Sequence, residues 1–300
     1  MKKVYALGFF DGVHLGHQAL IAQCVQLAKE LDAVPGAVTF DIHPQSLVSG
    51  QIPPMLNTVS ERMRLLRFYG IRQVHTLQFD RETMQMPWQD FFRYLVEELD
   101  AGALVCGDDF RFGSKGEGNA QLLAAACEQA GIACAVVPEQ TVDSIRVSST
   151  HIRSLIEQGQ MERAVDFLGH PHVLSGPVVS GRKLGHTIGV PTANLELPEG
   201  LVVPKLGVYA CKTVVDGREF PAVTNVGMRP TVNGHHITVE PWILDFDGDL
   251  YGRTIPLYFY KYLRPEVKFA SLEELQAQIL KDAEKTRDFL KISLYNRENL

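Results

Sequence analysis

Residues 4–17 read VYALGFFDGVHLGH, a short apolar run that leads into a turn with glycines and two histidines. The first four residues have the length and apolar character of a buried strand. After the turn, apolar residues recur at helical spacing, namely Leu20, Ile21, Cys24, Leu27, Ala28 and Leu31. A strand followed by a helix is the opening unit of a parallel α/β sheet. Ligands bind beyond the carboxyl ends of the strands in such sheets, so the turn is the first candidate binding site.

The same alternation continues through the first half of the chain. Short apolar runs predict further strands at 36–40, 73–77, 103–106 and 133–137. Helical patterns separate them, at 59–69, 88–99 and 119–130. Strands that alternate with helices of this length indicate βαβ units, and we therefore predict a Rossmann-like parallel sheet.

The pattern changes after about residue 170. Strand-like runs follow one another without helices between them, at 173–179, 208–215, 222–226, 237–246 and 254–260. Turn residues separate these runs, which predicts an antiparallel barrel or sandwich. A terminal helix is expected from Ser271, where Ser-Leu-Glu-Glu is a capping-box pattern. Two short helices, 149–158 and 161–168, end at Gly169, and we place the domain boundary there, giving domains 1–169 and 170–300.

Composition excludes several classes of protein. The 300 residues are 45% hydrophobic and 21% charged, with a net charge of −6, values typical of a globular protein. This charge gives no basis for binding nucleic acid or an anionic membrane. No apolar run is long enough for a membrane span or a signal peptide. The five cysteines form no Cys-x-x-Cys pair, which favours a reducing compartment, and we expect a cytoplasmic protein.

The turn after the first strand contains His14-Leu15-Gly16-His17 at the expected start of a helix. A helix N-terminus offers free N–H groups to a phosphate, and two histidines three residues apart can both face it. Capping of the helix or packing in a core is the alternative for the two histidines. A metal pair is disfavoured because no third ligand lies nearby. We include the neighbouring turn residues in this candidate phosphate site, namely Gly8, Phe9, Asp11 and Gly16.

Three further segments follow predicted strands, at 39–44, 107–113 and 146–153. The second offers aromatic side chains that could hold a planar ring, and its candidate pocket residues are Asp109 and Phe110. The third opens a helix with hydroxyl and guanidinium groups, a good phosphate site. Its candidates are Arg146, Ser149, Thr150 and Arg153. Each segment alone could be a turn or a surface helix start.

The second half begins with a glycine-rich stretch, residues 176–194. Its glycines can bend the backbone around phosphates, and the candidates are Gly181, Gly185 and Gly189. Thr192 and Asn194 then offer the hard oxygen ligands that Mg²⁺ prefers. A glycine-rich stretch by itself is usually only a loop.

Glu240 lies among apolar residues in the strand candidate ITVEPWIL, residues 237–244. A carboxylate buried there must be paired or used in catalysis, because burial of an uncompensated charge is costly. The alternative is an edge-strand glutamate that faces water, which Pro241 favours. Asp245, Asp247 and Asp249 resemble a calcium loop without its final glutamate, so we expect a hairpin turn.

Six motifs occur in an order that resembles the bacterial bifunctional riboflavin kinase/FMN adenylyltransferase family over essentially residues 1–290. They are Phe10–His17, Gly107–Gly113, Ser148–Arg153, Pro191–Asn194, Asn225–Thr231 and Leu244–Gly252. The resemblance implies an N-terminal Rossmann-like adenylyltransferase and a C-terminal β-barrel kinase. The chain departs from the family pattern at Ile42 (often Pro), His186 (usually Arg) and Trp242 (commonly His).

The resemblance also implies the chemistry. ATP would phosphorylate riboflavin to FMN, with Glu240 as general base and with Thr192 and Asn194 placing Mg²⁺ and the ATP phosphates. A second ATP would then adenylate FMN to FAD and release pyrophosphate. His14 and His17 would hold the ATP phosphates in that step, and no protein nucleophile is needed. Asn225 would belong to the flavin or nucleotide pocket, with Asp109 and Phe110.

Two rival functions are distinguishable. One is a nucleotidyltransferase that uses CTP or acts on pantetheine phosphate, with an accessory barrel. Small members of that superfamily, however, lack a second domain with Pro-Thr-Ala-Asn. The other is a flavin-sensing module without catalysis, against which Glu240 and the intact His-x-Gly-His argue.

Overall fold

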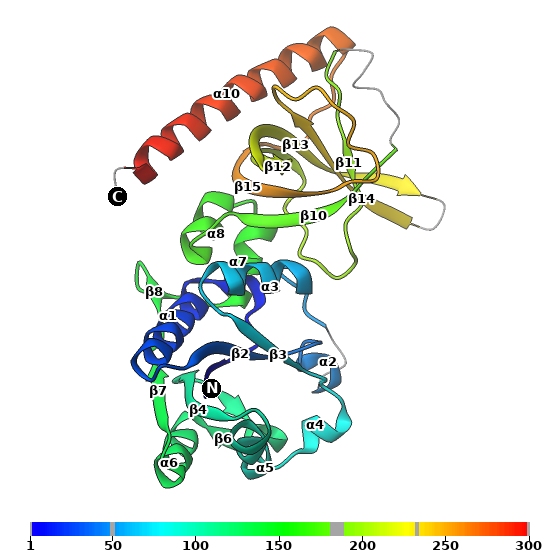
Figure 1. The fold of residues 1–300 in the computed structure, drawn as a ribbon. Coiled ribbons are helices and arrows are strands. Elements are labelled where there is room, and N and C mark those ends of the chain that lie inside the picture. Colours follow the sequence, from blue (N-terminus) through cyan, green and yellow to red (C-terminus); the bar gives the residue numbers. More distant parts are fainter. Residues whose placement is uncertain (1, 49–51, 181–188, 232–233, 299–300) are drawn as a thin grey trace. The chain divides into compact units, whose positions relative to one another are not determined.

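The computed structural model describes residues 2–48, 52–180, 189–231 and 234–298 (Figure 1). The chain divides into two compact units, Met1–Ser149 and Thr150–Leu300. Each unit has its own sheet, one parallel and one closed into a barrel. Among the described residues, no helix combines the length and the apolar character needed to cross a membrane.

The first unit is built on a five-stranded sheet in the order β3-β2-β1-β4-β7. All its neighbouring strands are parallel, which confirms the predicted sheet. The strands are β1 (Lys3–Leu7), β2 (Val34–Phe40), β3 (Gln73–Leu77), β4 (Ala101–Gly107) and β7 (Ala133–Val137). The chain runs outward from β1 on one side and returns at β4 on the other. The carboxyl ends of β1 and β4 therefore flank the crevice in which such sheets bind ligands.

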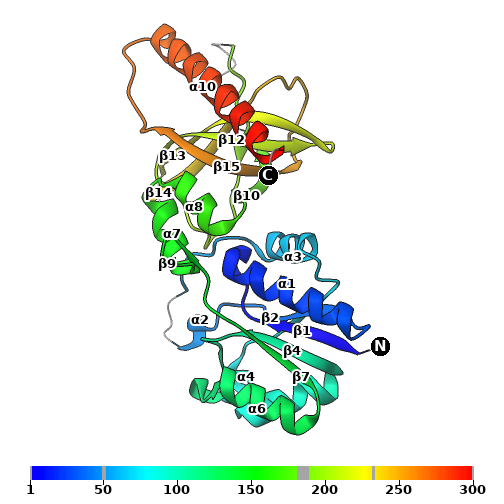
Figure 2. The same cartoon turned by 90° about the vertical axis from the view of Figure 1, so that its left-hand side faces the viewer.

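Helices cover both faces of this sheet (Figure 2). They are α1 (Leu15–Glu30), α2 (Gln45–Val48), α3 (Val59–Phe68), α4 (Arg81–Gln85), α5 (Trp88–Arg93) and α6 (Ala120–Ala130). The predicted helix 88–99 is divided, because a π-helical turn follows α5 at Tyr94–Glu98. Two small strand pairs complete the unit, β5 (Arg111–Phe112) with β6 (Gly118–Asn119), and β8 (Thr141–Val142) with β9 (Ile145–Arg146).

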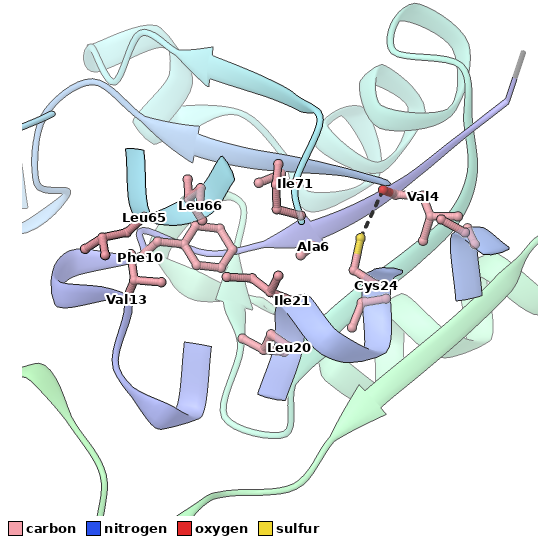
Figure 3. Packing of buried hydrophobic residues seen from close by; sticks show 14 residues of the cluster. Val4, Ala6, Phe10, Val13, Leu20, Ile21, Cys24, Leu65, Leu66 and Ile71 are labelled. Atoms are coloured by element: carbon pink, nitrogen blue, oxygen red, sulfur yellow. Dashed lines mark hydrogen bonds between the residues drawn. The ribbon is translucent and has the colours of Figure 1, made fainter. Parts of the chain in front are cut away.

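Alternate residues of β1 face two separate apolar cores. Val4 and Ala6 pack with residues of α1 and α3, and Cys24 of α1 donates its thiol to the Val4 carbonyl at 3.2 Å (Figure 3). Tyr5 and Leu7 pack on the other face with residues of α5 and α6. Because β1 is apolar on both faces, it is a central strand, and its end is held firmly from both sides.

Gly36 leaves room for the ring of Tyr5 on the adjacent strand. A Cβ at position 36 would lie 2.6 Å from the Tyr5 ring. We therefore expect Gly36→Ala to lower the free energy of unfolding by about 1–3 kcal/mol through overpacking. Urea denaturation followed by Trp88 fluorescence, in a Trp242→Phe background, measures this loss. The same substitution should be milder when Tyr5 is changed to Leu, and an equal loss in both backgrounds would contradict the explanation.

The second unit contains a closed antiparallel barrel in the order β10-β11-β14-β13-β12-β15. Its strands are β10 (His172–Val179), β11 (Asn194–Leu195), β12 (Gly207–Val215), β13 (Arg218–Thr231), β14 (Gly234–Ile243) and β15 (Thr254–Arg264). The closed sheet confirms the barrel over the sandwich. The predicted strand 237–246 ends earlier, at Ile243, and the hairpin expected at the aspartates that follow is wrong, because β14 and β15 are not neighbours in the barrel.

Two helices directly precede the barrel strands in the sequence, and one follows them. The predicted short helices are α7 (Ser149–Glu157) and α8 (Met161–Leu168), and α8 packs against β10 and β15. The terminal helix α10 spans Leu272–Glu298. The Ser271 hydroxyl accepts a hydrogen bond from the Glu274 N–H at 3.2 Å, so the predicted capping serine is confirmed.

His172 is buried in the barrel, and burial, followed by the charge of His170, lowers its pKa to about 3. Below about pH 6.5 the unfolded chain binds a proton at this position that the folded chain does not. The free energy of unfolding should therefore fall as the pH is lowered from 6.5 toward 3, by up to about 1.4 kcal/mol per pH unit.

This pH dependence is tested with His172→Phe, which removes the titrating group. Urea denaturation between pH 7.5 and 4, followed by Trp242 fluorescence in a Trp88→Phe background, should show a shallower pH dependence for the variant. Parallel curves for the two proteins would contradict the assignment.

Candidate active sites

A polar cavity of about 210 Å³ lies at the carboxyl ends of β1 and β4. The structure brings eight predicted site residues together in its lining, from segments far apart in the sequence. They are Gly8, His14, Gly16, His17, Asp109, Phe110, Arg146 and Ser149. The crevice expected from the sheet topology is thus lined with histidine, hydroxyl and guanidinium groups, and also with the carboxylates of Asp108, Asp109 and Glu139.

The two histidines occupy the first turn of α1. His14 caps the helix, because its Nδ1 accepts the His17 N–H at 3.4 Å. The two rings are stacked, with centroids 3.7 Å apart and an interplanar angle of 14°. The helix-capping alternative therefore describes His14. His17 differs, because its buried Nδ1 has no hydrogen-bond partner within the described part of the chain.

The pKa of His17 lies well below 6.5, because its ring is buried and because His14 and Arg62 lie nearby. The ring is therefore neutral near pH 7. A neutral imidazole carries one N–H and one bare nitrogen, so the free Nδ1 can donate to a phosphate oxygen in the appropriate tautomer. A buried polar atom left without a partner is costly, which makes this position suited to a bound polar ligand.

Gly16 lies close to the ring of His14, which caps α1. A Cβ at this position would lie 3.2 Å from the Cε1 and Nδ1 atoms of His14. The missing side chain therefore leaves room for the capping ring of His14. Gly16 still lines the polar cavity, so a ligand can approach its backbone.

Asp11 and Phe9 belong to the turn that follows β1. The buried carboxylate of Asp11 accepts the Leu56 N–H at 2.9 Å, and the Asp11 carbonyl accepts the Ser149 hydroxyl at 3.0 Å. Phe9 lines a neighbouring apolar cavity. Neither residue is in the lining of the polar cavity, and their contact with phosphate stays a prediction.

Arg62 of α3 supports the turn and was not predicted. Its buried guanidinium donates to the carbonyls of Phe9, at 2.9 Å, and Phe40, at 3.3 Å. It therefore joins the ends of β1 and β2. Its position on the apolar stripe of a predicted helix, three residues before Leu65, was the available signal.

The apolar cavity has a volume of about 510 Å³ and adjoins the polar cavity. The two share four lining residues, Leu7, Gly8, Asp109 and Phe110. Phe110 stacks on Phe112, with ring centroids 5.4 Å apart. Phe40 belongs to the candidate segment 39–44, whereas other apolar lining residues were not predicted, namely Phe79, Met84, Met86 and Phe91. A wall of rings and thioethers suits a planar aromatic ligand.

Arg146 belongs to β9 and forms ion pairs with Asp109 and, at 3.2 Å, with Glu139. All three side chains line the polar cavity. Thr150 and Arg153 belong to the second unit, and their contact with ATP in the first unit stays a prediction.

A second site lies at the barrel. A cavity of about 410 Å³, the barrel cavity, is lined by Thr192, Asn225 and Glu240. Apolar residues of β12, β14 and α10 complete much of its wall, including Val208, Trp242, Leu272, Leu275 and Ile279. A neighbouring cavity of about 290 Å³, the loop cavity, is lined by Thr192 and by the turn at Phe246–Tyr251. Thr192 lies at the junction of the two.

Glu240 is paired and does not lie on an edge strand. β14 pairs with both β11 and β13, so the edge-strand alternative is wrong. The side chain of Glu240 forms an ion pair with Arg229 of β13. The Nη2 atom of Arg229 also lies 3.5 Å from the amide oxygen of Asn194. Glu240 and Asn225 are opposite each other in the register of β13 and β14.

Polar residues that sequence reasoning missed line the same cavity. The amide of Asn225 donates to the carboxylate of Glu266 at 3.2 Å. Arg264 and the buried Asp282 form an ion pair at 2.9 Å, which ties β15 to α10. These contacts join residues distant in the sequence, so neither spacing nor a motif could indicate them.

Two predicted phosphate-binding glycines, Gly181 and Gly185, and the departure at His186 lie outside the described residues. Gly189 is described and has a φ of 70°, a conformation that favours glycine. The other two residues that depart from the family pattern are described in the structure. Trp242 lines the barrel cavity, and Ile42 is exposed.

Thr192 lines both the barrel cavity and the loop cavity, whereas Asn194 lines neither, so a magnesium site shared by these two residues stays a prediction. The two residues are two positions apart, and both carry hard oxygen atoms of the type Mg²⁺ prefers. The described residues contain no cluster of three or more His, Cys, Asp or Glu able to hold a metal. Phosphate oxygens would have to complete the coordination.

The parallel sheet with its histidine turn and the closed barrel with its paired glutamate define a two-unit transferase. A family model described as FAD synthetase matches residues 1–151, and one described as riboflavin kinase matches residues 168–290. The chain belongs to the bifunctional riboflavin kinase/FMN adenylyltransferase family.

Relatives of that description are similar over nearly the whole chain. The one from Listeria monocytogenes is 36% identical, over 96% of this chain and 93% of its own length. The one from Escherichia coli K12 is 37% identical, over 95% and 92%. A solved structure from Streptococcus pneumoniae, described as a macrolide-efflux protein, has a TM-score of 0.88 at 31% identity, and the match covers 95% of this chain and 94% of that one.

Proposed function

We propose that the second unit phosphorylates riboflavin to FMN and that the first unit adenylates FMN to FAD, with ATP as co-substrate in both steps. The observation that carries this assignment is the pair of adjoining cavities at β1 and β4. The polar cavity lies at the N-terminus of α1, and the apolar cavity is lined by aromatic side chains. Together the two cavities suit a nucleoside triphosphate and a planar flavin as the pair of substrates.

In the adenylylation step, the FMN phosphate attacks the α-phosphorus of ATP, and pyrophosphate leaves. The flavin ring packs in the apolar cavity against Phe110, and the triphosphate lies in the polar cavity. The neutral His17 ring and the N-terminus of α1 donate to phosphate oxygens whose charge rises in the transition state. Arg146 lines the same cavity in ion pairs with Asp109 and Glu139, and it would reach a phosphate oxygen by exchanging these partners.

In the kinase step, Glu240 accepts the proton of the ribityl hydroxyl as its oxygen attacks the γ-phosphorus of ATP, and ADP leaves. Riboflavin occupies the barrel cavity, and the nucleotide occupies the loop cavity. Thr192 lies between them and, with Asn194, would hold Mg²⁺. The metal ion, when bound, would neutralise phosphate charge.

Incubation of the full chain with riboflavin, Mg²⁺ and ATP, followed by chromatographic separation of flavins, tests this function. FMN should accumulate first and FAD later. Replacement of ATP by CTP should give no product. Binding of riboflavin without turnover would instead support the flavin-sensing alternative, and product from CTP would support the other rival.

We propose that the two activities separate by truncation near Gly169. α8 packs against β10 and β15, and Glu162 of α8 pairs with Lys261 at 2.8 Å. A fragment of residues 150–300 should therefore make FMN but not FAD. A fragment of residues 170–300 should make FMN with a lower melting temperature. A folded 150–300 fragment without kinase activity would contradict the domain assignment.

The cysteines bear on the place of action. All five are free in the structure, and four are buried. Unpaired thiols are typical of proteins in reducing compartments, which supports action in the cytoplasm.

A further inference from the structure

Arg229 connects two residues that the proposed kinase mechanism uses. Its guanidinium is ion-paired with Glu240, the proposed base. The same Nη2 atom lies 3.5 Å from the amide oxygen of Asn194, the proposed metal ligand. The three residues belong to the adjacent strands β13, β14 and β11. One cationic nitrogen therefore lies where a carboxylate oxygen and an amide oxygen converge.

The contacts of Arg229 differ in strength. Its contact with Glu240 is a charge-assisted hydrogen bond, whereas the longer contact with Asn194 joins it to a neutral amide. The side chains of Arg229 and Glu240 are 35% and 21% exposed, so water screens their attraction and the pair can rearrange. A metal-bound nucleotide can therefore displace the guanidinium from Asn194 more readily than from Glu240.

We propose that Arg229 is a positioning residue of the kinase. It holds the carboxylate of Glu240 in place, and it occupies the cation position beside Asn194 until the metal-bound nucleotide arrives. Nucleotide binding then releases Asn194, while Glu240 stays aligned with the ribityl hydroxyl. This inference rests on the proposed function, because it needs Glu240 to be the base.

Arg229→Ala removes the contacts of the guanidinium with Glu240 and with Asn194. We expect the kinase kcat to fall by about 10- to 100-fold, because a misplaced catalytic group can cost about 100-fold in rate. The KM for riboflavin should change by less than about threefold, since Arg229 is not in the lining of the barrel cavity. Arg229→Lys keeps the charge and should recover part of kcat.

A binding measurement tests the cation position separately from turnover. Calorimetric titration of ADP at several Mg²⁺ concentrations should show that Arg229→Ala needs less Mg²⁺ for half-maximal binding, because a competing cation has been removed. Arg253→Ala is the matched control, since it breaks another arginine–carboxylate pair of the second unit, with Asp216. It should change neither kcat nor the Mg²⁺ requirement. Melting temperatures verify that each variant is folded.

Two outcomes would overturn the inference. One is a folded Arg229→Ala variant with unchanged kcat. The other is a loss of ADP affinity at saturating Mg²⁺ with unchanged kcat, which would make Arg229 a phosphate ligand. Glu240→Gln, assayed in parallel, distinguishes a failure of the role of Arg229 from a failure of the proposed kinase base. If Glu240→Gln is inactive while Arg229→Ala is normal, only the inference about Arg229 fails; if Glu240→Gln is fully active, the proposed base is wrong.

Discussion

Glu240→Gln should lower the rate of FMN formation by about 100- to 10,000-fold, the range typical of a lost general base. The amide keeps the shape of the side chain and can still accept a hydrogen bond from Arg229, but it cannot take the proton of the ribityl hydroxyl. FAD formation from supplied FMN should be unchanged, because that step is assigned to the other unit. The two rates are measured separately on the purified variant.

Glu219→Gln is the matched control for Glu240→Gln. Glu219 also lies in the barrel and forms an ion pair, with Lys212 at 3.0 Å, but it is in the lining of neither the barrel cavity nor the loop cavity. Its loss should leave the kinase rate close to that of the parent, because Glu219 contributes no group to either cavity. A folded Glu240→Gln variant with a kinase rate as high as that of Glu219→Gln would reject Glu240 as the base.

His17→Ala should slow FAD formation from FMN by about 100- to 1000-fold, the cost of losing one donor to transition-state charge. The Nδ1 of His17 has no protein partner among the described residues, so its removal breaks no hydrogen bond of that ring nitrogen. FMN formation from riboflavin should continue at the parent rate. Both rates are followed by chromatography of the flavins.

His75→Ala is the control for His17→Ala, because His75 lies on the same sheet and bonds the Tyr94 hydroxyl, away from both cavities. It should leave FAD formation nearly unchanged. His14→Ala is a less selective variant, because His14 caps α1 and its loss also destabilises the helix. If His17→Ala lowered both activities equally, a folding role would explain the effect and the phosphate role would be wrong.

Local sequence patterns predicted much of this fold. Strands such as Val4–Leu7 are short and apolar on both faces, so they are identifiable without their neighbours. The barrel was less certain, because alternating strands with turns suit a sandwich equally well, and only the pairing of β10 with β15 distinguishes the two. The end of β14 was misplaced because apolar residues continue beyond Ile243 into the turn.

The location of candidate site residues was predictable where a motif, as at His17, or a charge within an apolar strand, as at Glu240, marks them, and both residues line a cavity. Residues that act through long-range contacts were not predictable. Arg62 was found only because two strand ends meet at its guanidinium, and Arg229 because three strands are adjacent. Asp11 is the opposite case, because it lies inside the predicted phosphate-binding turn but is not in the lining of the polar cavity. Its carboxylate accepts the backbone N–H of Leu56.

In the proposed function, two separate sites act in sequence on different phosphorus atoms of ATP, the γ-phosphorus in the kinase step and the α-phosphorus in the adenylylation step. Labelling ATP at the γ-phosphate or at the α-phosphate and following each label from riboflavin tests it most directly. The γ-label should enter FMN and then FAD, and the α-label should enter FAD alone. With Glu240→Gln, riboflavin should take up neither label, whereas supplied FMN should still take up the α-label. Entry of the α-label into flavin without prior entry of the γ-label, or loss of α-label transfer to FMN in Glu240→Gln, would contradict the account.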